Sequence, residues 1–145
     1  MIILSISIVI FIVLEFANIM ILYFKPDSRV GNGVAVFKAW EDSKQDEDLH
    51  LFVRYMTNWV AGTKLIFIFL LLVILFIGSE TIKMVSVIAM ILSISTYFWR
   101  LHPLIVKLDM KGEIIPKGYS KQLRTMIAGF LGLFIVALVI YFLMR

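Results

Sequence analysis

Four long apolar runs constrain the fold of this 145-residue chain more than any other feature. They cover about residues 1–24, 57–78, 80–101 and 123–144. A helix rises about 1.5 Å per residue, so a run of about 20 residues crosses the roughly 30 Å hydrocarbon core of a bilayer. The chain is 61% hydrophobic, whereas soluble domains are about 45–50% apolar. We therefore predict an all-α integral membrane protein, with residues 1–145 forming a single membrane domain built as a four-transmembrane-helix bundle.

The lysine and arginine residues predict how the four helices are oriented. Five of the 14 lie between the first and second runs: Lys25, Arg29, Lys38, Lys44 and Arg54. Six lie between the last two runs or at their facing ends: Arg100, Lys107, Lys111, Lys117, Lys121 and Arg124. The opposite side has only Lys83 and Arg145. Because short cytoplasmic loops collect positive charge, we expect both termini outside, segments 25–56 and 102–122 in the cytoplasm, and insertion into the plasma (inner) membrane.

The first apolar run differs from a cleaved signal peptide. It has no basic residue before Lys25, and it is longer than the roughly 7–15 apolar residues of a signal sequence. We therefore expect it to be retained as a membrane span.

The first cytoplasmic segment contains two amphipathic stretches. Val34, Phe37 and Trp40 recur at helical spacing, which favours a short interfacial helix at the headgroups, or a docking surface for a partner. Further on, Asp46 precedes an acidic pair, as at the capped start of a helix, and this helix is expected to continue into the second run. Clustered carboxylates also suit Ca²⁺ or Mg²⁺, but the spacing of a calcium-binding loop is missing, so we predict no metal site.

The second cytoplasmic segment is expected to prolong the third span. Leucines at helical spacing continue beyond Trp99, Pro103 is predicted to bend this helix, and Gly112 is predicted to end it. Ser120 is the predicted N-cap of the fourth helix. Three basic residues nearby are candidates for contact with an anionic lipid or a phosphate, or are simple topology anchors: Lys117, Lys121 and Arg124.

Glu15 is the one acidic residue that the sequence places at membrane depth. It lies nine residues before Phe24, which is roughly 13 Å along a helix. A glutamate side chain is too short to reach water from there, so it must be protonated, paired or hydrated. Intramembrane carboxylates of this kind are typical of functional sites.

Helix phase and depth predict a polar pocket around Glu15 in the cytoplasmic half of the bundle. The predicted lining consists of Glu15, Asn18, Asn58, Thr96, Tyr97 and Arg100. Arg100 is expected to point from the cytoplasmic interface back toward the pocket, because side chains tilt toward the N-terminus of their helix. Lys64 lies five residues inside Trp59, and we expect it to snorkel to the cytoplasmic surface.

Small residues mark the predicted helix contacts. The third span carries Ser86, Ala89 and Ser93 on one face, and the fourth carries Ala128 and Gly132 four residues apart. Such residues let bilayer helices approach closely, so we expect both sets to pack against other helices.

Transport or channel activity is the first functional hypothesis, with Glu15 as a proton or cation site, or as part of a site for a small solute. Four helices enclose little space, so a pore would require a homo-oligomer. The net charge of +4 follows from the basic loops and does not indicate nucleic-acid binding.

A second hypothesis is enzymatic and rests on a resemblance. The segment Arg54-Tyr-Met-Thr-Asn58 at the second span, with Arg100 and the pair Gly118-Tyr119, resembles in plan the membrane-associated eicosanoid and glutathione metabolism superfamily. The acid that follows the asparagine in that family is replaced here by Ala61. The resemblance implies a trimeric transferase that binds glutathione or a lipid between helices near the cytoplasmic face.

The third hypothesis is a non-catalytic accessory or scaffold subunit, whose spans pack beside a larger membrane-protein partner. The sequence has no metalloprotease H-E-x-x-H, no G-x-S-x-G and no Walker loop. It contains no cysteine, and no pattern in it predicts a cofactor.

Overall fold

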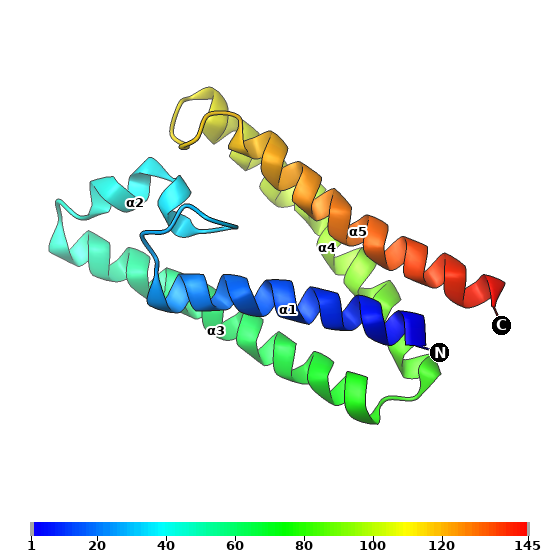
Figure 1. Cartoon of the computed structure of the whole chain (residues 1–145). Coiled ribbons are helices and arrows are strands. Elements are labelled where there is room, and N and C mark those ends of the chain that lie inside the picture. The colour runs from blue at the N-terminus through cyan, green and yellow to red at the C-terminus, as the bar shows by residue number, and fades with distance from the viewer. Residues whose placement is uncertain (1, 145) are drawn as a thin grey trace.

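The structure is a computed structural model that describes residues 2–144, and within this range it is helical (Figure 1). Its elements are α1 (Ile2–Phe24), the 3-10 helix η1 (Val34–Val36), α2 (Lys38–Ser43), α3 (Glu47–Ile77), α4 (Glu80–Met110) and α5 (Tyr119–Leu143). Among these elements α1, α3, α4 and α5 are long and apolar enough to cross a membrane. The predicted all-α bundle with four candidate spans is thus confirmed.

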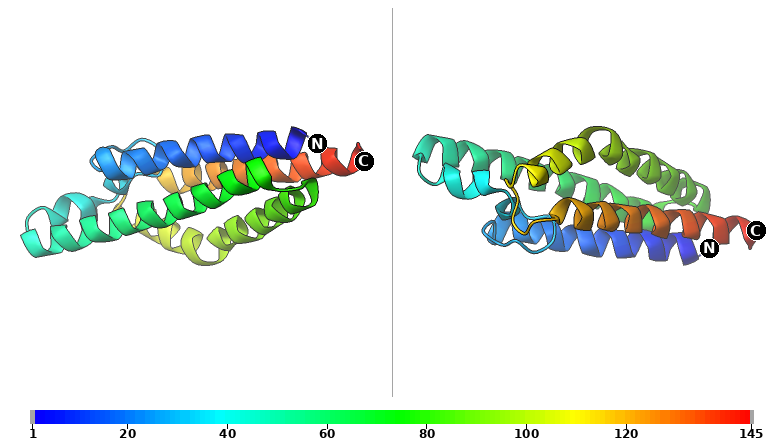
Figure 2. Two further views of the ribbon diagram at one scale, coloured as in Figure 1. Left: turned by 90° about the horizontal axis from the view of Figure 1, so that it is seen from below. Right: turned by 90° about the horizontal axis from the view of Figure 1, so that it is seen from above.

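The four long helices are not packed evenly. α1 packs on α3 and α5, and α4 packs on α5, whereas α3 and α4 contact each other only slightly. Figure 2 shows α4 bowed away from α3 along much of its length. In the most apolar window of α1, 39% of the residues are buried, against 17–22% in the other three helices. α1 is therefore the central helix, and Glu15 lies on it.

The main apolar core joins all four long helices. Phe11 of α1 contacts Phe130 and Phe134 of α5, with ring centroids 5.1 and 5.4 Å apart. The same cluster includes Ile68 of α3 and Met90 of α4. Because α3 and α4 contact each other only slightly, this side of the bundle is open.

Two helices continue past their apolar runs, as the sequence predicts. α3 begins in the first loop, where the carboxylate of Asp46 accepts a hydrogen bond from the Leu49 amide at 3.1 Å. α4 continues through Pro103 and ends at Met110. Proline lacks the N–H that would close the helical turn before it, and α4 curves in Figure 2. Gly112 follows the end of α4 with φ +74°, a left-handed conformation that favours glycine.

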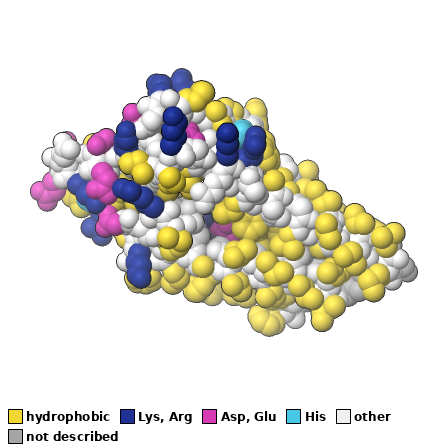
Figure 3. All heavy atoms as spheres, turned by 45° about the horizontal axis from the view of Figure 1, so that its top comes forward, with side chains coloured by type: hydrophobic (Ala, Val, Ile, Leu, Met, Phe, Trp, Pro, Cys, Tyr) yellow, Lys and Arg dark blue, Asp and Glu magenta, His cyan; other side chains and the backbone are white. Residues whose placement is uncertain are grey.

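The α1–α3 and α4–α5 segments meet at one end of the molecule, here called the basic end. Lys and Arg side chains gather there in Figure 3, while the rest of that face is mainly hydrophobic. The amides of Lys38 and Ile115 donate to the carbonyls of Glu113 and Val36 at 3.0 and 2.8 Å. These bonds join the two loops into one platform.

Two sequence predictions at the basic end are corrected. Trp40 is not free to contact lipid headgroups or a docking partner, because the residue is 2% exposed and its Nε1 donates to Asp27 at 2.7 Å. Ser120 is not the N-cap of α5, because the helix begins at Tyr119 and Gly118 occupies the N-cap position. The capping acceptor is Asp109 of α4, which receives the amides of Gly118 and Ser120 at 2.9 and 3.0 Å. A carboxylate from another helix therefore satisfies these first N–H groups.

Candidate functional site

A charged cluster lies between α1 and α3. The ammonium Nζ of Lys64 is 2.8 Å from a carboxylate oxygen of Glu15. The same Nζ donates a hydrogen bond of 2.6 Å to the side-chain oxygen of Asn18. Both distances are those of strong, charge-assisted contacts.

The helices place these three side chains together for simple reasons. Glu15 and Asn18 are three residues apart, so they share one face of α1. That face meets α3, the helix with which α1 makes its most extensive contact. The lysine stem is long enough to reach across from α3, and the contact between the opposite charges offsets part of the cost of their partial burial.

The expectation that Lys64 snorkels to the surface is therefore wrong. Its ammonium turns to α1, and its side chain is 27% exposed, against 18% for Glu15. The sequence does contain a signal for this pair. Glu15 lies nine residues from Phe24 and Lys64 lies five residues from Trp59, so two opposite charges lie at similar distances from the same ends of two adjacent apolar runs.

Asn18 leaves one polar atom unused. The residue is 8% exposed, and its side-chain Nδ2 has no hydrogen-bond acceptor among the described residues. An unpaired buried donor costs about 1–3 kcal/mol. The side-chain oxygen of Asn18 accepts the hydrogen bond from Lys64, and this bond fixes the orientation of the amide. In that orientation the Nδ2 donor points where no acceptor is available among the described residues.

An open groove of about 670 Å³ runs beside this cluster, where α3 and α4 diverge. Trp59 and Phe67 of α3 and Met90 and Ile94 of α4 line it, and Lys64 belongs to the same wall. Lys64 thus links the charged cluster to a cavity whose lining is otherwise largely apolar.

The structure brings two of the six predicted pocket residues together and places the other four elsewhere. Asn58 is exposed and lines a hollow of only about 10 Å³ near the basic end. Tyr97 is buried in a second apolar cluster with Tyr119, and its hydroxyl lies 3.3 Å from His102.

The remaining two predicted residues lie on the outer side of α4. The Thr96 hydroxyl donates to the Ser93 carbonyl of its own helix at 2.6 Å. Arg100 is exposed and its guanidinium lies 4.4 Å from the centre of the Trp99 ring, a cation–π contact. Arg100 therefore contacts its own helix and not Glu15.

The predicted anionic contacts, Lys117, Lys121 and Arg124, are exposed at the start of α5. The amides at this helix start are partly occupied by Asp109. An anion here would therefore depend mainly on the three side chains.

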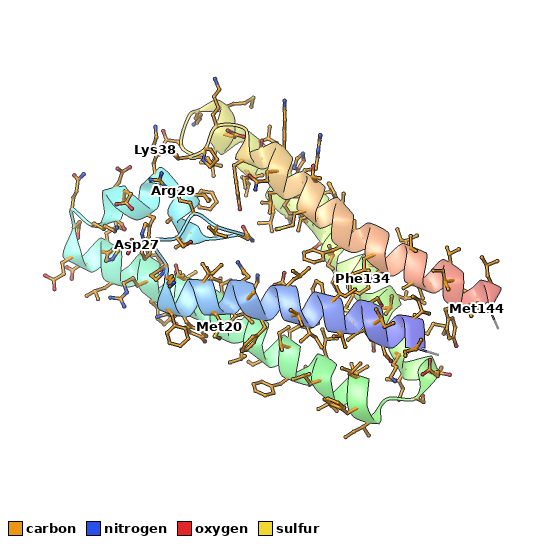
Figure 4. All side chains as sticks on the ribbon, viewed as in Figure 1. Met20, Asp27, Arg29, Lys38, Phe134 and Met144 are labelled. Atoms are coloured by element: carbon orange, nitrogen blue, oxygen red, sulfur yellow. The ribbon has the colours of Figure 1, made fainter. Side chains whose placement is uncertain are left out.

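The titratable groups of the first loop form a separate, exposed cluster. Lys44 contacts Asp27 at 2.7 Å and Glu41 at 3.0 Å, and Figure 4 shows Asp27 at the basic end with Arg29 and Lys38. The hydrogen bond from Lys44, with that from Trp40, holds the pKa of Asp27 below its ordinary value. Among residues 2–144, no three His, Asp or Glu side chains are placed to hold a metal ion together.

Comparison with known proteins adds no relative. No protein-family model, no curated protein and no solved structure matches the chain.

Proposed function

We propose that the protein inserts into a membrane with both termini outside and acts there as a small transport or channel-type protein. Its site is the cluster of Glu15, Asn18 and Lys64. One observation carries the proposal: a direct 2.8 Å ion pair within helices apolar enough to span a bilayer. Charged residues at such depth are costly and are typical of ion and substrate pathways.

The pair suggests how a charge is handled. While Glu15 and Lys64 are in contact, each neutralises the other, so the resting site carries no net charge. When they separate, each buried charge needs a replacement partner. A proton or a cation at Glu15 and an anion at Lys64 satisfy both. The site therefore favours transport in which the pair opens and closes as the transported ion or solute passes.

Proton flux into liposomes tests this proposal. Purified protein is reconstituted around a trapped pH dye, and a pH step is applied in the presence of a clamped membrane potential. Wild-type protein should dissipate the step faster than empty liposomes, and Glu15→Gln should lower the rate to that of empty liposomes. Lys83→Met, which removes a lysine near the opposite end of the molecule, is the matched control and should keep the wild-type rate.

Two results contradict the proposal. One is equal flux in wild-type protein and Glu15→Gln. The other is the absence of flux from wild-type liposomes for protons and, in parallel assays, for small cations and anions.

An accessory role is the second candidate, and the outward-facing small residues favour it. Ala89 of α4 and Ala128 of α5 are exposed, and nothing lies within 4 Å of a Cβ built on Gly132, whereas Ser93 lines the α3–α4 groove. The predicted close-packing faces are therefore unused within one chain and suit a neighbouring helix, either of a larger membrane protein or of a second copy. Co-purification of one fixed partner in mild detergent supports the accessory role, whereas a uniform homo-oligomer supports the first proposal.

A further inference from the structure

The groove between α3 and α4 has one charged position in an apolar lining. Its walls include Trp59, Phe67, Met90 and Ile94, and Lys64 is the only lining residue with a formal charge. Glu15, the partner of Lys64, does not belong to the lining. A molecule in the groove therefore meets the side chain of Lys64 and not that of Glu15.

The ammonium has bonding capacity that the protein does not use. Lysine has three N–H donors, and Lys64 directs them to two protein acceptors, Glu15 at 2.8 Å and Asn18 at 2.6 Å. One donor remains, and 27% of the side chain is exposed. An anionic oxygen in the groove can accept this bond without displacing either protein partner.

The shape and depth of the groove select among anions. Its volume of about 670 Å³ lies within the roughly 300–1,000 Å³ of small-molecule sites, and its open side faces outward between two spans. Lys64 is five residues inward of Trp59, or roughly 7–8 Å, while phospholipid headgroups lie at the level where tryptophan is enriched. A small head on one apolar chain reaches this depth more easily than a bulky, hydrated phospholipid headgroup.

From this geometry we propose that the α3–α4 groove binds a long-chain carboxylate, a single-chain anionic amphiphile that enters sideways from the bilayer. Its carboxylate contacts Lys64 and its chain lies along Phe67, Met90 and Ile94. This inference rests on the proposed function and names the substrate class of that site. In a transport cycle, the ligand carboxylate takes the place of Glu15 on Lys64 when the pair opens.

Trp59 provides a probe within the groove wall. We would measure quenching of its fluorescence by dibrominated stearate and by the uncharged methyl ester of the same acid, in protein-containing liposomes at a pH where the acid is ionised. Trp99 is 71% exposed and is replaced by Phe throughout. The signal remaining in a Trp59→Phe variant is subtracted, so that buried Trp40 does not contribute.

The inference makes three matched predictions. In each, the affinity is calculated from the concentration of ligand in the membrane and not from the total concentration. The acid should bind about tenfold more tightly than the ester. Lys64→Met should reduce the acid to the affinity of the ester without changing the ester, whereas Lys64→Arg and the control Lys83→Met should keep the preference. Glu15→Gln should strengthen acid binding, because it removes the negative charge that neutralises the Lys64 ammonium.

Equal affinities of acid and ester in wild-type protein overturn the inference, as does a preference that survives in Lys64→Met. If Lys64→Met fails to fold, Lys64→Gln replaces it and should likewise abolish the preference for the acid. Glu15→Gln, which should raise the affinity for the acid, provides a second test. Binding is measured without flux, so the two proposals fail separately. If the protein shows no preference for the acid but carries a proton flux that depends on Glu15, only this inference fails. If it binds the acid through Lys64 but carries no flux, only the transport proposal fails.

Discussion

Substituting Lys64 or Glu15 should lower the free energy of unfolding, and the two losses should not be additive. Removing one member of a buried pair costs about 3–5 kcal/mol in soluble proteins. These side chains are 27% and 18% exposed, so we expect a smaller cost of about 2–3 kcal/mol for Lys64→Met, which also strips Asn18 of its donor. Glu15→Gln should cost about 1–2 kcal/mol, because the amide oxygen still accepts from Lys64.

The double variant distinguishes a pair from two independent residues. With both charges gone, no unpaired ion remains, so the loss in the double variant should be smaller than the sum of the single losses by about 2 kcal/mol. Unfolding by SDS in mixed micelles, followed by loss of helical circular dichroism, gives these free energies. Lys83→Met is the control, since Lys83 pairs with Glu80 at 3.7 Å and not with Glu15, so its loss and that of Glu15→Gln should add within error. Additive losses within error for Lys64→Met and Glu15→Gln would refute the reasoning.

Three further predictions concern the basic end. Asp109→Ala removes the acceptor that caps α5 and should cost about 1–2 kcal/mol in the same SDS titration; an unchanged midpoint would show that the cap is dispensable. Tyr119→Phe deletes the 2.9 Å hydrogen bond from its hydroxyl to the Gly31 carbonyl and should speed tryptic cleavage after Arg29, whereas equal rates would contradict the contact. For Asp27, a pKa held below the ordinary 3.8 means that its stabilisation is present above pH 3.8 and is lost as the pH falls through the folded-state pKa. The ion pair of Asp27 with Lys44 is exposed, so it should stabilise the loop by less than about 1 kcal/mol at neutral pH. Hydrogen exchange of the loop amides should therefore differ slightly between wild type and Asp27→Asn at neutral pH, and the difference should vanish in acid. A difference that persists in acid would contradict the pairing of Asp27 with Lys44.

The sequence was sufficient for the helices and for much of their boundaries. Apolar runs about 20 residues long have few alternatives to a spanning helix, because a bilayer leaves no other partner for backbone polar groups. Local chemistry also located the start of α3 at Asp46 and the end of α4 before Gly112. Both depend on the residues within one turn, so neither needs knowledge of the tertiary structure.

The site was predicted only in part, because helix phase does not say which helices are neighbours. Glu15 and Asn18 share a face of α1 whatever surrounds it. The partner was expected to be Arg100 on α4, yet α4 bows away and α3 supplies Lys64 instead. For the same reason, the sequence did not indicate that Asp109 of α4 caps the start of α5. Without that long-range contact, Ser120 was the only local candidate for the cap.

The most direct test of the central claim is a measurement of the Glu15–Lys64 contact in a lipid bilayer. Solid-state NMR on protein with ¹³C-labelled glutamate and ¹⁵N-labelled lysine side chains reports dipolar coupling between Glu15 Cδ and Lys64 Nζ, with Glu15→Gln identifying the signal. The structure predicts strong coupling, as expected for a nitrogen 2.8 Å from a carboxylate oxygen. If the only coupling present survives in Glu15→Gln, or none is found, the charged pair on which the proposed function rests does not exist in the membrane.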